Sequence, residues 1–193
     1  MKALRFWLPM MDGSEQEIII PAEYVESIIL PAAEHEAGHI IAAHHHNARV
    51  LGIGVGFIPE LDQRGMFLQA LYSWKDWSIE IQCVVKAAGP AADTMYLGGF
   101  GEKEVSGDLR DIENLTGIAS LEPYLGRAKQ ILAGYPAQFK SITTLLHQSL
   151  ENVEERTLGI LPDNRIGALL LDEAQLMQCL GSGEIDGCND NLR

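Results

Sequence analysis

Hydrophobic and polar residues alternate most clearly in residues 50–57, VLGIGVGF, where large apolar residues take turns with glycine. A two-residue period is typical of a β-strand, here with one bulky face and one bare face. The stretch GMFLQAL at 65–71 predicts a partner strand across a turn at 59–65. The segment GSEQEIIIP at 13–21 predicts a loop followed by another short strand.

Longer segments favour helix. Residues 32–46 contain good helix formers and no internal proline, and Gly38 is their weakest position. Residues 22–30 predict one or two helical turns that end at Pro31, which also suits the first turn of the next helix. After Asp76 we expect helices at 77–97, 107–119, 122–133, 136–156 and 172–180, with connections at 98–101 and 159–165. The sequence therefore predicts a mainly α protein with a small β-sheet, an α+β fold.

Length and composition limit the class of protein. A chain of 193 residues with 47% hydrophobic and 21% charged residues predicts one folded domain, at 1–180, followed by a flexible tail at 181–193. The formal net charge of −13 argues against binding to nucleic acid or to an anionic membrane surface. No apolar run is long enough to span a membrane and the N-terminus is a poor secretory signal, so we expect a cytoplasmic protein. Cys83, Cys179 and Cys188 lack C-x-x-C spacing and fit reduced thiols.

The chemistry of the sequence is concentrated in AAEHEAGHIIAAHHHNARV, residues 32–50. His35 and His39 form an H-E-x-x-H motif with Glu36, and residues four apart lie on one face of a helix, so both imidazoles can reach one zinc ion. Glu36 stands beside them as a candidate general base for hydrolysis. Gly38 leaves room for another element to approach the helix next to the metal.

A third ligand is needed, and His45 is the first candidate by spacing. Its pattern differs from the metzincin motif by Ala42, where that motif has the glycine that ends the helix. In a continuing helix His45 lies about 120° away from the ligand face, and His46 returns to that face nearly two turns away. We therefore expect the triplet His44–His46 to be a solvated helix end, with a second metal site there as the alternative.

Two later segments extend the pattern. KAAGPAADTMYLGG at 86–99 and SGDLRDIENLTGIA at 106–119 follow HEAGH in the order and approximate spacing of the FtsH-type zinc peptidase domain of AAA proteases. The chain resembles that family from about residue 32 to 120 and more loosely beyond. The resemblance implies a zincin-type helical metallopeptidase fold.

The resemblance also implies a third ligand, because the family uses an aspartate within an S-x-D-hydrophobic pattern at the start of a later helix. Asp108, two residues after Ser106, fits this pattern, and Asp111 is the rival because the residues after it also resemble the family's continuation. Asp93 stands where the family usually has glutamate and could bind a ligand histidine. Solvated carboxylates at the start of a helix are the alternative for both later aspartates.

The same resemblance gives roles to neighbouring segments. Ala91 and Ala92 are expected to pack against the ligand helix. The strand at 50–57 corresponds to the family's edge strand beside the active site, where its bare face could admit an extended peptide. Close packing against a helix is the other explanation for its glycines.

We therefore expect an ATP-independent zinc metallopeptidase with one catalytic zinc on His35, His39 and Asp108. Its substrates would be peptides or loosely folded proteins, because the chain has no G-x-x-x-x-G-K-[ST] segment that would belong to an unfolding motor. Because the family assembles its protease domains into rings, the resemblance implies self-association into a homo-oligomer. A non-catalytic zinc-containing peptide-binding or regulatory protein is the main alternative. A peptide deformylase fits less well, because no E-G-C-L-S segment surrounds Cys83.

Overall fold

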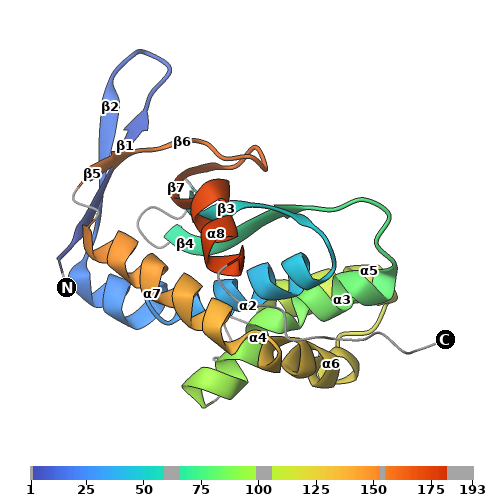
Figure 1. The fold of residues 1–193 in the computed structure, drawn as a ribbon. Coiled ribbons are helices and arrows are strands. Elements are labelled where there is room, and N and C mark those ends of the chain that lie inside the picture. The colour runs from blue at the N-terminus through green and yellow to red at the C-terminus, as the bar shows by residue number, and fades with distance from the viewer. Residues whose placement is uncertain (1, 59–65, 99–105, 153–154, 182–193) are drawn as a thin grey trace.

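The chain folds into a mostly helical body with two small sheets, which confirms the predicted α+β fold (Figure 1). The structure is a computed structural model that describes residues 2–58, 66–98, 106–152 and 155–181. The predicted turn at 59–65 and most of the predicted tail lie outside these residues. No helix in the described part is both long and apolar enough to cross a membrane.

The two sheets differ in topology. The smaller has the order β2-β1-β5, in which β1 runs antiparallel to β2 and parallel to β5. The larger is antiparallel throughout and has the order β4-β3-β7-β6. The strand bounds are β1 Leu4–Pro9, β2 Glu15–Ile20, β3 Arg49–Phe57, β4 Met66–Ser73, β5 Glu155–Thr157, β6 Gly159–Ile160 and β7 Ile166–Asp172.

Helices pack around a central helix, α2, which also contacts the larger sheet through β3 and β4 (Figure 1). Most of its residues are buried because α4, α6 and α7 contact it as well. The bounds are α1 Ala22–Tyr24, the π-helical turn η1 Val25–Ile29, α2 Ala32–His45, α3 Ile79–Lys86, α4 Ala88–Ala92, the π-helical turn η3 Asp93–Leu97, α5 Ser106–Thr116, α6 Glu122–Ala133, α7 Pro136–Asn152 and α8 Glu173–Gly181.

Gly38 allows α4 to approach α2 closely. A Cβ atom at Gly38 would lie 2.4 Å from the carbonyl oxygen of Ala88 and 2.9 Å from Cβ of Ala92. Both distances are too short for a real contact, so only glycine fits here. The expectation that Gly38 admits a neighbouring element is confirmed. The expected packing of Ala91 and Ala92 against the ligand helix is confirmed as well, because α4 lies against α2 and both alanines are buried.

The prediction that the strand at 50–57 is an edge strand open to a peptide is wrong. β3 is an internal strand between β4 and β7, and the edge strands of the sheet are β4 and β6. A Cβ atom at Gly54 would meet Leu161, and one at Gly56 would meet the ring of Phe67. The glycines therefore make room for atoms of the neighbouring strands and their connections.

The predicted helix at 77–97 is divided into α3, α4 and η3. Pro90 explains the break, because a proline ring clashes with the carbonyl group four residues earlier, here that of Lys86. The helix predicted at 136–156 ends at Asn152, and the strands β1, β5, β6 and β7 were not predicted. The apolar run of β7, IGALLLD, shows why: periodicity alone does not separate a short buried strand from a helix.

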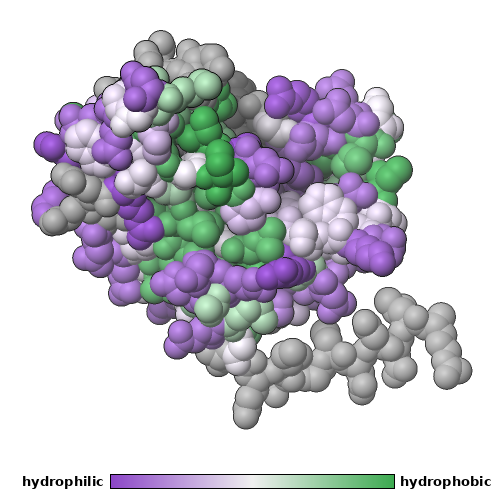
Figure 2. All heavy atoms as spheres, turned by 90° about the horizontal axis from the view of Figure 1, so that it is seen from above, coloured by the Kyte–Doolittle hydropathy of each residue, from purple (hydrophilic) through white to green (hydrophobic). Residues whose placement is uncertain are grey.

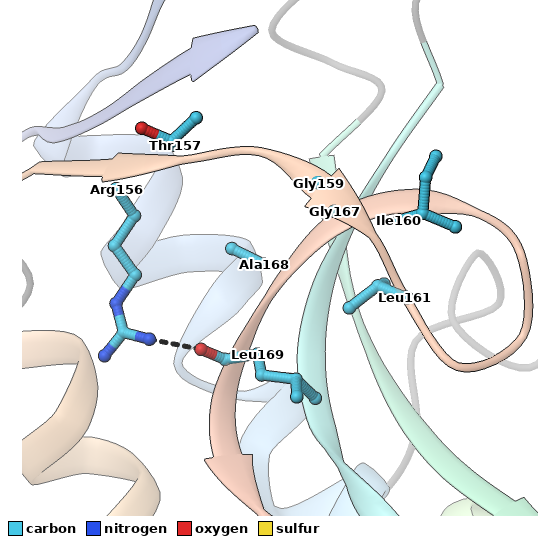
Figure 3. Close-up of a pocket in the computed structure, with 8 residues that line it drawn as sticks. All are labelled: Arg156, Thr157, Gly159, Ile160, Leu161, Gly167, Ala168 and Leu169. Atoms are coloured by element: carbon cyan, nitrogen blue, oxygen red, sulfur yellow. Dashed lines mark hydrogen bonds between the residues drawn. The ribbon is translucent and has the colours of Figure 1, made fainter. Parts of the chain in front are cut away.

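Hydrophobic side chains gather in the middle of one face of the molecule, between hydrophilic flanks (Figure 2). An open pocket of about 510 Å³ lies between the segment from Arg156 to Leu161 and the strand β7, and a guanidinium N–H of Arg156 donates to the carbonyl oxygen of Leu169 beside it (Figure 3). None of the predicted metal ligands lines this pocket. The chemistry suggested by the sequence is located elsewhere.

Candidate metal centre

The two histidines of the motif present their Nε2 atoms to each other. His35 and His39 project from successive turns of α2, and their Nε2 atoms lie 3.1 Å apart. A carboxylate oxygen of Asp108, from the first turn of α5, lies 3.0 Å and 3.2 Å from the two atoms. All three side chains are buried. The structure thus brings together the three predicted ligands.

Hydrogen bonds on the far side of each imidazole fix its tautomer. Nδ1–H of His35 donates to the carboxylate of Asp93, and Nδ1–H of His39 donates to the carbonyl oxygen of Val85, both at 2.8 Å. Because both partners are acceptors, each neutral imidazole keeps the lone pair of Nε2 for the centre. Two Nε2 lone pairs and a carboxylate therefore face one another, an arrangement that needs a cation or a proton among them.

Without a metal ion, a proton on His35 would meet this need. Burial alone would lower the pKa of His35, but the hydrogen bonds to Asp108 and Asp93 outweigh it and hold that pKa well above its usual value. Burial opposes ionisation of Asp108, and the two imidazoles nevertheless depress its pKa strongly. The charge pattern is that of a site that attracts a cation.

The donor set and the available space fit zinc. Ligand atoms about 2.0–2.2 Å from a tetrahedral zinc ion lie about 3.3–3.6 Å from one another, a few tenths of an ångström more than the spacing found here. A Cβ atom at Gly89 would lie 2.4 Å from Nε2 of His35 and 2.5 Å from Nε2 of His39. Glycine at the second position of α4 therefore leaves open the space in front of the two ligand atoms.

Glu36 lies beside the ligands, between α2 and the edge strand β4. Its Oε2 accepts the backbone N–H of Ala70 at 2.5 Å. Burial raises the pKa of Glu36, and the nearby imidazoles oppose this shift. The carboxylate thus has the higher basicity that a general base needs, and it stands next to the outer edge of the larger sheet.

Lys86 and Asp111 form a charged pair at the rim of the centre. The Lys86 ammonium lies 2.6 Å from the Asp111 carboxylate and 3.9 Å from the second oxygen of Asp108. Tyr72 of β4 is a neighbour: burial raises the pKa of its hydroxyl to about 12, and the charge of Lys86 opposes that shift. The rival aspartate is therefore engaged by Lys86 and does not face the histidines.

The histidine triplet lies outside the centre, as expected. Nδ1 of His45 lies 3.2 Å from the hydroxyl of Tyr135, and the ring of His46 packs edge-on against Trp77. The expectation of a solvated helix end is only partly right, because His44 and His46 are half-buried and burial lowers their pKa values. Among the described residues, the single group of side chains able to hold a metal ion is His35, His39 and Asp108.

Four residues of the site were not predicted: Val85, Gly89, Ala70 and Lys86. Val85 and Ala70 contribute main-chain groups, which side-chain patterns do not report. Gly89 was visible as the glycine of AGPAAD, and its role depends on the path of α4 over α2. Lys86 carries no motif, and its position follows only from the packing of α3 on α5.

Comparison with known proteins adds no support to the resemblance to the FtsH-type peptidase. No protein-family model matches the chain, and no curated protein matches it significantly. The function is therefore inferred from the site itself.

Proposed function

We propose that the protein is an ATP-independent zinc metallopeptidase, with zinc held by His35, His39 and Asp108. The observation that carries this proposal is the convergence of two tautomer-fixed Nε2 atoms and one carboxylate, all buried, with a glutamate beside them. Structural zinc sites usually close with four protein ligands, whereas catalytic sites use three and leave one position open. Three such ligands converge among the described residues.

In the proposed reaction Glu36 is the general base. Zinc, when bound, would polarise the peptide carbonyl and lower the pKa of a water molecule to about 7. Glu36 accepts a proton from the attacking water and returns it to the amine that leaves. Its raised pKa favours the first transfer, because a more basic carboxylate takes up a proton more readily.

The edge strand β4 offers a place for an extended substrate. Its partner β3 lies on one side, and the described residues contain no strand on the other. The N–H of Ala70 and the carbonyl group of Met66 point to that outer side, where they bind Glu36 and Tyr24. A peptide that adds to this edge would pass Glu36. This geometry favours peptides and loosely folded proteins as substrates.

The alternative is a zinc-containing protein that binds peptides without cleaving them. A structural site has no need of a base, so the position of Glu36 next to the ligands favours catalysis. The test is cleavage of fluorescently labelled casein by the purified, zinc-loaded protein without ATP, with Glu36→Gln as the matched control.

We expect cleavage by the wild type and none by Glu36→Gln, with one zinc in each. Equal cleavage by both would refute the assigned base. An absence of cleavage by either, with one tightly held zinc in both, would support the non-catalytic alternative.

A further inference from the structure

Two aspartates on α5 lie near the metal centre and near the same lysine, Lys86. Asp108 and Asp111 are three residues apart, so they share one face of the helix. One oxygen of Asp108 faces the two histidines, while the Asp111 carboxylate is turned to Lys86. Both carboxylates lie within 4 Å of one ammonium group, so Asp111 is a neighbour of the carboxylate that faces the histidines.

Lys86 stands between these carboxylates from the last turn of α3. Its Nζ atom contacts Asp111 at 2.6 Å and lies 3.9 Å from the oxygen of Asp108 that does not face the histidines. The side chain of Lys86 is 29% exposed and that of Asp111 is 43% exposed, so Asp111 has room to turn if the pair is broken. In the described part of the chain, Lys86 is the ion-pair partner of Asp111.

We propose that Lys86 is a positioning residue that keeps Asp111 off the metal, so that the centre has three protein ligands and an open coordination position. The inference rests on the proposed zinc centre. A hard carboxylate one helical turn from a bound ligand is a competent additional ligand for zinc. If Asp111 bound the ion, it would occupy the position that water or substrate requires. Lys86 prevents this by offering Asp111 a closer cation.

The test uses cobalt(II) in place of zinc, because the visible absorption of cobalt reports the number and geometry of its ligands. Lys86→Met should recruit Asp111 and raise the coordination number, with a fall in the molar absorption of the bound cobalt. Lys86→Met/Asp111→Asn should regain the wild-type spectrum, because the competing carboxylate is gone. Lys86→Arg should also keep the wild-type spectrum.

Each result separates this inference from the proposal on which it rests. A wild-type protein that binds no cobalt or zinc would refute the metal centre itself. A wild-type protein that binds cobalt, together with an unchanged spectrum in Lys86→Met, would overturn the role of Lys86 alone. Loss of cobalt in Asp111→Asn would also overturn it, because Asp111 would then be a ligand. Circular dichroism and thermal unfolding of each metal-free variant confirm that it is folded. If Lys86→Met does not fold, cobalt binding by Asp111→Asn supplies the decisive result.

Discussion

Asp93 accepts a hydrogen bond from Nδ1 of His35 at 2.8 Å, and this contact turns Nε2 of the same ring toward His39 and Asp108. Asp93 is almost completely buried. A buried carboxylate behind a ligand histidine fixes the tautomer and increases the basicity of the donor nitrogen. The orientation of the first ligand therefore depends on a residue that is not itself one of the three ligands.

Asp93→Asn should weaken zinc binding by about 10- to 100-fold, because an amide accepts the Nδ1–H bond without the negative charge. A competitive chelator titration measures the change. Asp163→Asn, the same chemical change in a surface turn, is the control and should bind zinc like the wild type. A zinc affinity of Asp93→Asn within two-fold of the wild type corresponds to a change in binding free energy of about 0.4 kcal/mol or less. Such a result would show that the contact does not matter for binding.

Gly89→Ala should abolish zinc binding, because its Cβ atom would lie 2.4 Å from Nε2 of His35. Gly126→Ala is the matched control: it lies within α6, and a Cβ atom there meets nothing within 4 Å. We expect it to stabilise the protein by about 0.5–1 kcal/mol. Zinc content after dialysis and thermal unfolding are the measurements. Full zinc occupancy in Gly89→Ala would contradict the described path of α4.

The stability of the metal-free protein should fall as the pH rises above about 6.5, the ordinary pKa of histidine. The pKa of His35 is raised in the folded state, so its contribution is complete below the unfolded pKa and is lost as pH rises through the folded pKa. Zinc binding requires the unprotonated ring, so zinc affinity should rise through the same range. Denaturant unfolding from pH 6 to 9, with and without zinc, measures both trends. A metal-free protein that gains stability over this range would contradict the assigned sign.

As the pH is lowered, the rate of casein cleavage should fall with a midpoint above the ordinary pKa of glutamate, about 4.3. Burial raises the pKa of Glu36, and the base must be ionised to accept a proton. The acidic limb of kcat/KM against pH measures this, at pH values where zinc content is confirmed to be constant. An acidic limb at or below the ordinary glutamate pKa would mean that another group is the base.

Local spacing was sufficient to identify part of the site. The i, i+4 spacing of His35 and His39 places both rings on one face whatever the rest of the fold does, provided that the segment is helical. Gly38 was informative for the same reason, since its effect is local to α2. Asp108 is 73 residues from His35, and only the resemblance to a known family selected it over Asp111.

The parts that were not predicted depend on contacts between distant segments. The strands β1 and β5 are more than 140 residues apart in the chain and pair with each other, a relationship that no local period reports. The role of β4 as an edge strand likewise depends on β7, which joins β3 on the other side. Main-chain groups such as Val85 C=O and Ala70 N–H leave no mark in the residue pattern, although they orient His39 and Glu36.

The central claim is that His35, His39 and Asp108 together hold one zinc ion. Anomalous diffraction at the zinc edge from crystals of the zinc-loaded protein tests it most directly. The account predicts one strong peak about 2.0–2.2 Å from both Nε2 atoms and from an oxygen of Asp108, with Asp111 on Lys86. A peak bound by Asp111 in place of Asp108, a peak at His44–His46 alone, or no peak at all would contradict it.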